Sequence, residues 1–247
     1  MIFPIVFRKL EIQLGFGWAT RVIGFIALGT LAISLIILKP RIRPAKKRSL
    51  LEPAAFKEAP YTLFSVALFC IFVGLYIPFF YIPTYAQQKL NVSENLSFYL
   101  LSILNGASVF GRIIPNIIAD HLGALNVLLP FVFCASVLAF AWIAIRNLAG
   151  IIVFAILYGF FSGSIVSLPP TALAALSPDL SRVGTRMGMS FSFAGFGLLL
   201  GSPIAGAILE TRAGFTGASA FGAAAVMVGF IFMVLAVVAH QIEVQDK

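Results

Sequence analysis

Seven stretches of this chain contain no Asp, Glu, Lys or Arg, and each is long enough to cross or nearly cross a lipid bilayer. They are residues 22–38, 59–88, 95–111, 122–145, 147–178, 187–209 and 213–241. A hydrocarbon layer about 30 Å thick takes roughly 20 helical residues to cross. A backbone exposed to lipid must satisfy its own hydrogen bonds, which a helix does within one segment. The sequence therefore predicts an all-α polytopic membrane protein with about seven transmembrane helices.

The charge distribution predicts the orientation of these helices in the lipid bilayer. Seven basic residues crowd the segment 39–58, and basic residues beside a span are typical of a cytoplasmic loop. Alternating from this loop places eleven basic residues in cytoplasmic segments and five in outer segments, with Arg21 at the outer edge of the first span. We therefore expect the loop 86–96 outside and the C-terminus in the cytoplasm. The net charge of +8 does not indicate nucleic-acid binding, because no folded domain is available to carry a basic patch.

The third span carries a polar stripe, which we define as Asn105, Ser108, Arg112 and Asn116. At 100° per residue these side chains fall within about 60° of one another. An Arg within a span is costly in lipid and by default marks a substrate or ion path. The alternative is that Arg112 lies near the cytoplasmic end, where it snorkels or pairs with Asp120.

Few residues are available for other chemistry. The two histidines, His121 and His240, lie at the predicted membrane edges, and no acid–base pair lies within a span. We expect no enzymatic activity, metal or cofactor. Cys70 and Cys134 lie in apolar spans, and we expect each to be a small buried hydrophobic side chain. A seven-helix receptor fits the count, but the basic loop follows the first span and the receptor motifs Asp-Arg-Tyr and Asn-Pro-x-x-Tyr are absent.

Five short motifs resemble the major facilitator superfamily, and within it the fungal monocarboxylate-transporter-like group. They are Gly-Phe-Gly-Trp-Ala-Thr-Arg at 15–21, Gly-Arg-Ile-Ile-Pro-Asn at 111–116, Ala-Asp-His-Leu-Gly at 119–123, Ser-Leu-Pro-Pro at 167–170 and Val-Gly-Thr-Arg-Met-Gly-Met at 183–189. The family has twelve spans in two six-helix halves, and this chain resembles spans six to twelve. The resemblance implies a secondary transporter that moves a small organic solute by alternating access. A monocarboxylate-like, anionic solute is favoured, and the plasma membrane is favoured over an internal membrane.

The resemblance also implies a division of the chain. Residues 1–17 would be a remnant of the preceding span and outer loop, 18–38 the last span of the N-terminal half, and 39–58 the central cytoplasmic loop. Residues 59–241 would be the six-helix C-terminal half, and 242–247 a cytoplasmic tail. We expect a truncated chain that lacks most of its N-terminal half. The alternative is an inert or regulatory membrane fragment without transport of its own.

Two departures from the family pattern bear on mechanism. Ser108 stands where animal monocarboxylate transporters have an Asp tied to proton coupling, so this site is not expected to couple protons in that way. Asp120 and Gly123 match the gating loop of the superfamily. However, Asn116, His121, Ala124 and Leu125 stand where Gly and basic residues are usual. Asp120 and Gly123 therefore remain the gating-loop candidates.

Overall fold

The computed structural model describes residues 2–38, 51–177, 179 and 181–245. The chain divides into two compact units, Met1–Lys47 and Arg48–Lys247, and each is described by itself. Most of the predicted basic loop, residues 39–50, lies outside the described residues, as do the last two residues of the predicted tail.

The first unit contains one helical element, α1 (Ile2–Ile37), which holds the candidate span Gln13–Ile37. Gly15 interrupts its helical geometry with φ 77° and ψ 164°, a conformation that glycine adopts without steric cost. The chain is therefore helical on both sides of Gly15.

The second unit holds six further candidate spans, and the described residues contain no strand. This confirms the all-α polytopic fold class with seven membrane helices. After the short 3₁₀ helix η1 (Pro53–Lys57), the elements are α2 (Ala59–Leu75), α3 (Ile77–Leu90), α4 (Glu94–Leu122), α5 (Ala124–Ala141), η2 (Trp142–Ala144), α6 (Leu148–Ser167), α7 (Pro169–Ala175), α8 (Val183–Leu209) and α9 (Gly214–Gln245).

Two of the spans are interrupted by a break that is followed by proline. Pro78 lies in the first turn of α3, after a break at Tyr76, and Pro169 begins α7 after a break at Leu168. A break leaves carbonyl oxygens unpaired, and within a membrane another protein group has to satisfy them. The buried Tyr158 hydroxyl donates to the carbonyl oxygen of Leu75 at 2.8 Å. This bond ties α6 to the α2–α3 break.

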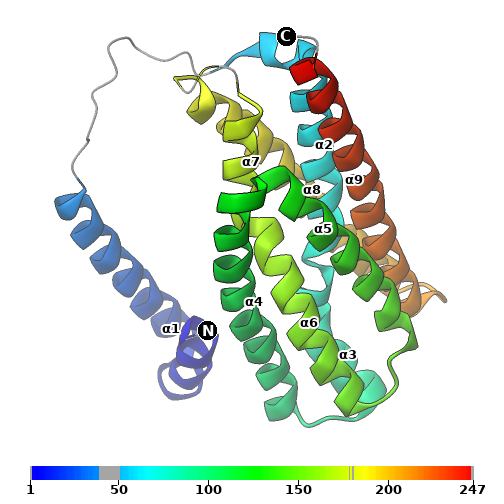
Figure 1. The fold of residues 1–247 in the computed structure, drawn as a ribbon. Helices are drawn as coiled ribbons and strands as arrows, with labels where there is room; N and C mark the ends of the chain where they lie inside the picture. The colour runs from blue at the N-terminus through cyan, green and yellow to red at the C-terminus, as the bar shows by residue number, and fades with distance from the viewer. Residues whose placement is uncertain (1, 39–50, 178, 180, 246–247) are drawn as a thin grey trace. The chain divides into compact units, whose positions relative to one another are not determined.

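The helices of this unit pack backbone to backbone at glycines. α2 packs against α8 and α9, whereas α4 packs against α6, and Figure 1 shows α4 beside α6. A side chain at Gly201 would overlap the carbonyl oxygen of Val73, and one at Gly197 would overlap that of Phe69. The small-residue pair Gly197 and Gly201 on α8 therefore brings α8 directly onto α2, as small-xxx-small pairs do in membranes.

The six spans run back and forth, so their connections gather at two ends. One end holds η1, the α4–α5 junction, the segment before α8 and the end of α9. The other end, called here the 86–96 end, holds the α3–α4, α5–α6 and α8–α9 connections. Charged residues at the two ends are therefore separated by the length of a span.

We predict that Gly201→Ala lowers the thermal stability of the purified protein in detergent. The added methyl group would meet the Val73 carbonyl, and overpacking of this kind typically costs about 1–3 kcal/mol. Gly195→Ala is the matched control, because Gly195 lies on the same helix and has nothing within 4 Å of an added Cβ. Both substitutions raise the helix propensity by the same amount, so the two variants differ only in the contact that the added methyl group makes. Equal melting temperatures for the two variants would contradict the close contact of α2 and α8.

Candidate functional site

Helix α4 presents a buried ridge to α6, and the two flanks of this ridge differ in chemistry. Leu104, Ser108, Gly111 and Pro115 form the middle of the ridge. A side chain at Gly111 would overlap the carbonyl oxygen of Phe160 on α6. The two backbones therefore touch, and residues on either side of the ridge lie on separate surfaces.

One flank of α4 carries polar side chains, with the exposed Val109 and Ile113 beside them. Asn105, Arg112 and Asn116 lie about 40–80° from Ser108 around the helix, and Asp120 follows further round. Asn105 and Asn116 are half-buried, whereas Arg112 is exposed. We call the residues Asn105, Arg112 and Asn116 the polar flank.

The other flank of α4 is apolar. Ile103, Ala107, Phe110 and Ile114 line an open groove of about 520 Å³ between α4 and α6, and no polar side chain is among the described residues that line it. Aliphatic and aromatic side chains of this kind suit contact with lipid tails. The α4–α6 pair thus has one face suited to lipid and one suited to water or a polar partner.

The amides of the polar flank are held by hydrogen bonds to backbone carbonyl oxygens and to one serine hydroxyl. Asn105 donates to the carbonyl oxygen of Leu101 at 2.9 Å. Asn116 donates to the Arg112 carbonyl oxygen at 2.5 Å and to the Ser167 hydroxyl at 2.9 Å. Ser167 is the last residue of α6, so Asn116 fixes α4 to the α6–α7 break.

Ser108 differs from the other three residues of the polar stripe. It is 4% exposed, lies in the ridge against α6, and donates to the Asn105 carbonyl oxygen at 2.7 Å. A Cβ at Gly163 of α6 would overlap the Ser108 carbonyl oxygen. The structure therefore brings Asn105, Arg112 and Asn116 together on one open surface and places the Ser108 side chain in a helix contact.

Arg112 has no ion-pair partner among the residues that the structure describes, and Asp120 does not pair with it. Its charge lies near enough to the Tyr76 phenol for the two to interact electrostatically. Tyr76 occupies the α2–α3 break, and its ring lies 5.2 Å from that of Phe79. Aromatic side chains therefore lie within electrostatic range of Arg112.

The two gating-loop candidates lie at the C-terminal end of α4. Asp120 is exposed in the last turn of α4. Gly123 caps the helix with φ 85° and donates its amide to the Ala119 carbonyl oxygen at 2.9 Å. A positive φ favours glycine, because a side chain would be strained there. The chain reversal between α4 and α5 is therefore enough to explain a glycine at position 123.

A second group of charges, the ion cluster, joins η1 and α2 to the start of α8. We define it as Glu52, Glu58, Arg182 and Arg186. The Arg186 guanidinium, 2% exposed, donates to both oxygens of Glu58 at 2.6 and 2.7 Å and to those of Glu52 at 3.2 and 3.3 Å. Arg182 donates to Glu52 at 2.9 Å. From the sequence, Arg182 and Arg186 counted only as basic residues of a cytoplasmic segment, with Arg186 also in the motif at 183–189, and no ion pair was expected.

Electrostatic effects follow the geometry of the ion cluster. The Arg186 hydrogen bonds, with a further contribution from Arg182, hold the pKa of the Glu52 carboxyl below its ordinary value of 4.5. Arg186 also lies 5.5 Å from the centre of the Tyr61 ring, and the Tyr61 hydroxyl donates to the Arg186 carbonyl oxygen at 2.9 Å. The sequence signal was the pair of acids within the basic loop together with two arginines one helical turn apart.

We predict that Arg186→Ala destabilises the protein strongly, by about 3 kcal/mol, because it leaves two carboxylates without their buried partner. Arg182→Ala is the control: its side chain is 60% exposed, so the expected loss is under about 1 kcal/mol. Melting temperatures in detergent at pH 7 provide the comparison. Equal losses in the two variants would contradict the central role of Arg186.

The same comparison has an expected pH dependence. Because the pKa of Glu52 is lowered in the folded protein, its contribution is present above its ordinary value of 4.5 and is lost as the pH falls through the folded value. The difference between wild type and Arg186→Ala should therefore stay constant from pH 7 to about pH 5 and shrink as the pH falls below 4.5 toward the lowered pKa of Glu52.

Comparisons with known proteins agree on one family. The sequence profile described as Major Facilitator Superfamily matches residues 1–151. An MFS-type transporter, dbaD, of Emericella nidulans is 41% identical over 237 residues, which cover 95% of this chain and 53% of that protein. The aspyridones efflux protein apdF of the same organism is 39% identical over a match that covers 93% of this chain and 47% of apdF. The agnestins efflux protein AgnL12 of Paecilomyces divaricatus is 34% identical over a match that covers 96% of this chain and 54% of AgnL12.

A solved structure shares the fold. The crystal structure of the transporter FucP in the outward conformation superposes with a TM-score of 0.65 at 16% identity, covering 92% of this chain and 55% of FucP. The chain thus spans about half the length of the curated relatives it matches. It is an integral, multi-pass membrane protein that belongs to the major facilitator superfamily of transporters.

Proposed function

We propose that the complete transporter exports a small organic anion by alternating access, and that Arg112 binds the anionic group. The observation that carries this proposal is the contrast between the two flanks of α4. Ionisable residues within membrane spans face a water-filled cavity or a bundle interior rather than lipid. The polar flank would accordingly line the solute path, and the apolar groove would face the bilayer.

Several features favour an anion with an organic body. Arg112 is the only Lys or Arg between Lys89 and Arg146. Its guanidinium has no carboxylate partner among the described residues, so a carboxylate in the path would find a planar, bidentate donor. The aromatic rings around Tyr76 would provide apolar contacts for the rest of the molecule.

The relatives support the proposed direction and the proposed membrane. Two of them are described as efflux proteins, for aspyridones and for agnestins. Export of a metabolite from the cell requires a transporter in the plasma membrane. A monocarboxylate-like solute remains the proposed class, because one guanidinium suits one carboxylate.

We predict that Arg112→Ala raises the KM for transport of a labelled aromatic monocarboxylate, such as benzoate, by tenfold or more. Losing a charge-assisted contact typically costs about 1.5–3 kcal/mol, which corresponds to about ten- to a hundredfold in affinity. Arg112→Lys should also transport less well, because an ammonium cannot replace the bidentate fork. The assay would use a chimera in which only the part of the Emericella nidulans transporter dbaD that precedes the region matched by this chain is joined in front of it, so that no span is duplicated, at matched surface amounts.

Phe110→Ala provides the control, because Phe110 lies at a similar depth on the apolar flank and should leave KM unchanged. Normal transport by both Arg112 variants would contradict the proposed anion contact. Transport by residues 1–247 alone would be measured in parallel. This comparison shows how much of the transport activity depends on the added dbaD segment.

The water-lined flank has its own test, which needs no substrate. In a chimera without Cys70 and Cys134, single cysteines replace Asn105, Arg112 or Asn116. Matched cysteines replace Ile103, Phe110 or Ile114 at similar depths. A charged methanethiosulfonate reagent should modify the first set at least about tenfold faster, because only thiols in water react as thiolates. Equal rates on both flanks would contradict a solute path along the polar flank.

A further inference from the structure

A second polar site lies at the 86–96 end of the bundle, a span's length from the ion cluster. This basic pocket has a volume of about 210 Å³. Its walls come from the end of α3, from η2 and the connection after it, and from the start of α9. The lining residues used below are Tyr85, Lys89, Trp142, Arg146, Arg212 and Phe215. None of these elements contributes to the polar flank of α4.

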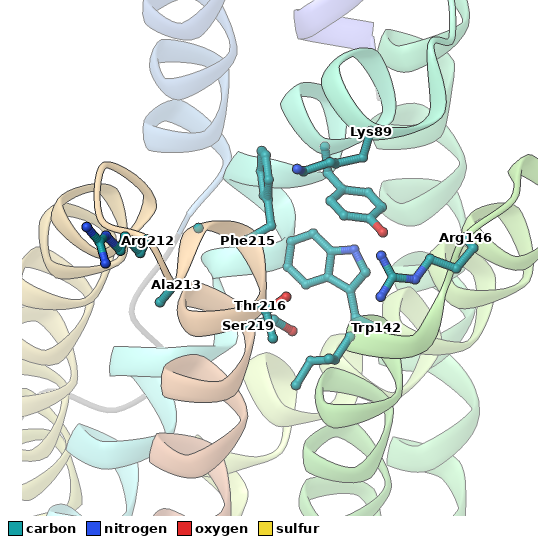
Figure 2. A pocket seen from close by; sticks show the side chains of 11 residues that line it. Lys89, Trp142, Arg146, Arg212, Ala213, Phe215, Thr216 and Ser219 are labelled. Atoms are coloured by element: carbon teal, nitrogen blue, oxygen red, sulfur yellow. The ribbon is translucent and has the colours of Figure 1, made fainter.

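The charges at the basic pocket are all of one sign. Lys89, Arg146 and Arg212 line it, and no acidic residue is among the described residues that do so. Within the described part of the chain, none of these three cations has an ion-pair partner. In Figure 2 the Arg146 guanidinium points toward Trp142 and the Lys89 side chain reaches over the aromatic residues, whereas the Arg212 guanidinium turns away. Lys89 and Arg146 are therefore the cations that an anion would meet.

A buried donor at the wall of the basic pocket also lacks an acceptor. Trp142 is 3% exposed, and its indole nitrogen Nε1 is buried without a hydrogen-bond partner. A buried donor left unpaired costs about 1–3 kcal/mol. The neighbouring Tyr85 hydroxyl already donates to the Ile145 carbonyl oxygen at 2.5 Å. In Figure 2 the indole nitrogen lies on the side facing Arg146, so an acceptor held by Arg146 would lie beside it.

The rest of the wall keeps the basic pocket rigid and adds positive potential. The Tyr85 ring packs edge-on against Trp142 at 5.6 Å and against Phe215 at 5.2 Å. Residues 214–216 begin the long helix α9, and a helix N-terminus carries a partial positive charge and free amides. Fixed aromatic walls with a positive rim favour a compact anion.

We propose that the basic pocket binds a phosphate-type oxyanion, either a soluble phosphate or the headgroup of an anionic phospholipid. A volume of 210 Å³ equals about seven water molecules at about 30 Å³ each, and it is below the roughly 300 Å³ of pockets for larger ligands. It suits one phosphate group. Aromatic and basic residues at this end also match the composition of a membrane–water interface, where a headgroup would lie. The site is separate from the proposed solute path and does not depend on it.

Tryptophan fluorescence tests this proposal directly, because the chain has two tryptophans and Trp18→Phe leaves Trp142 as the reporter. One arm titrates inorganic phosphate against the purified protein in neutral detergent, with chloride at equal ionic strength as the comparison. The other arm places the protein in bilayers of phosphatidylcholine with or without phosphatidylglycerol. Each arm uses the Trp18→Phe protein and, on that background, Arg146→Gln, Lys89→Gln and Lys57→Gln.

A saturable response to phosphate that weakens at least about tenfold in Arg146→Gln and Lys89→Gln supports a soluble anion as the ligand. A response to phosphatidylglycerol only, lost in the same variants, supports the lipid headgroup. Lys57→Gln removes the same charge at the opposite end of the bundle and should bind as the parent does. The proposal is overturned if neither probe changes the fluorescence, or if Arg146→Gln responds as the parent does.

Discussion

Close contact between helix backbones at glycines determines how the second unit, Arg48–Lys247, is built. Lipid tails are as apolar as leucine, so helices in a membrane gain little from hiding hydrophobic side chains and depend on close packing instead. Gly74 of α2 meets the carbonyl of Gly222 on α9, and Gly201 of α8 meets that of Val73 on α2. Gly111 and Phe160 join α4 to α6 in the same way. These contacts set the rotation of each helix, and the rotation decides which residues face one another.

The rotation of α4 illustrates the functional consequence. Because Gly111 faces α6, Arg112 must lie on one side of the contact and Phe110 on the other. The separation of a polar flank from an apolar groove thus follows from one backbone contact. The α2–α3 break adds to it, because the Tyr158 bond to the Leu75 carbonyl oxygen holds Tyr76 and its neighbouring rings in place. A solute path needs both a polar surface and fixed walls, and under the proposed function this arrangement would provide one side of such a path.

Three arginines in this unit show how surroundings decide what a charge can do. Arg186 is buried, but four carboxylate oxygens neutralise it, so it joins two segments of the chain. Arg112 is exposed within a span and has no such partner in the described residues, which leaves it available to a solute. Arg146 lies at a helix connection beside an unpaired indole N–H, where an oxyanion could satisfy both. The same residue type therefore serves stability in one place and suits binding in two others.

The sequence by itself determined the class, the number of spans and the family, because long charge-free segments have one stable form in lipid and the motifs at 111–123 and 183–189 are local. It also predicted the polar stripe, since helical periodicity places residues by angle alone. Only the tertiary structure decided that Ser108 faces α6, that Arg186 pairs with Glu52 and Glu58 from more than 120 positions away, and that Lys89 and Arg146 share a pocket. These facts depend on helix rotation and on contacts between distant segments, which no local pattern encodes.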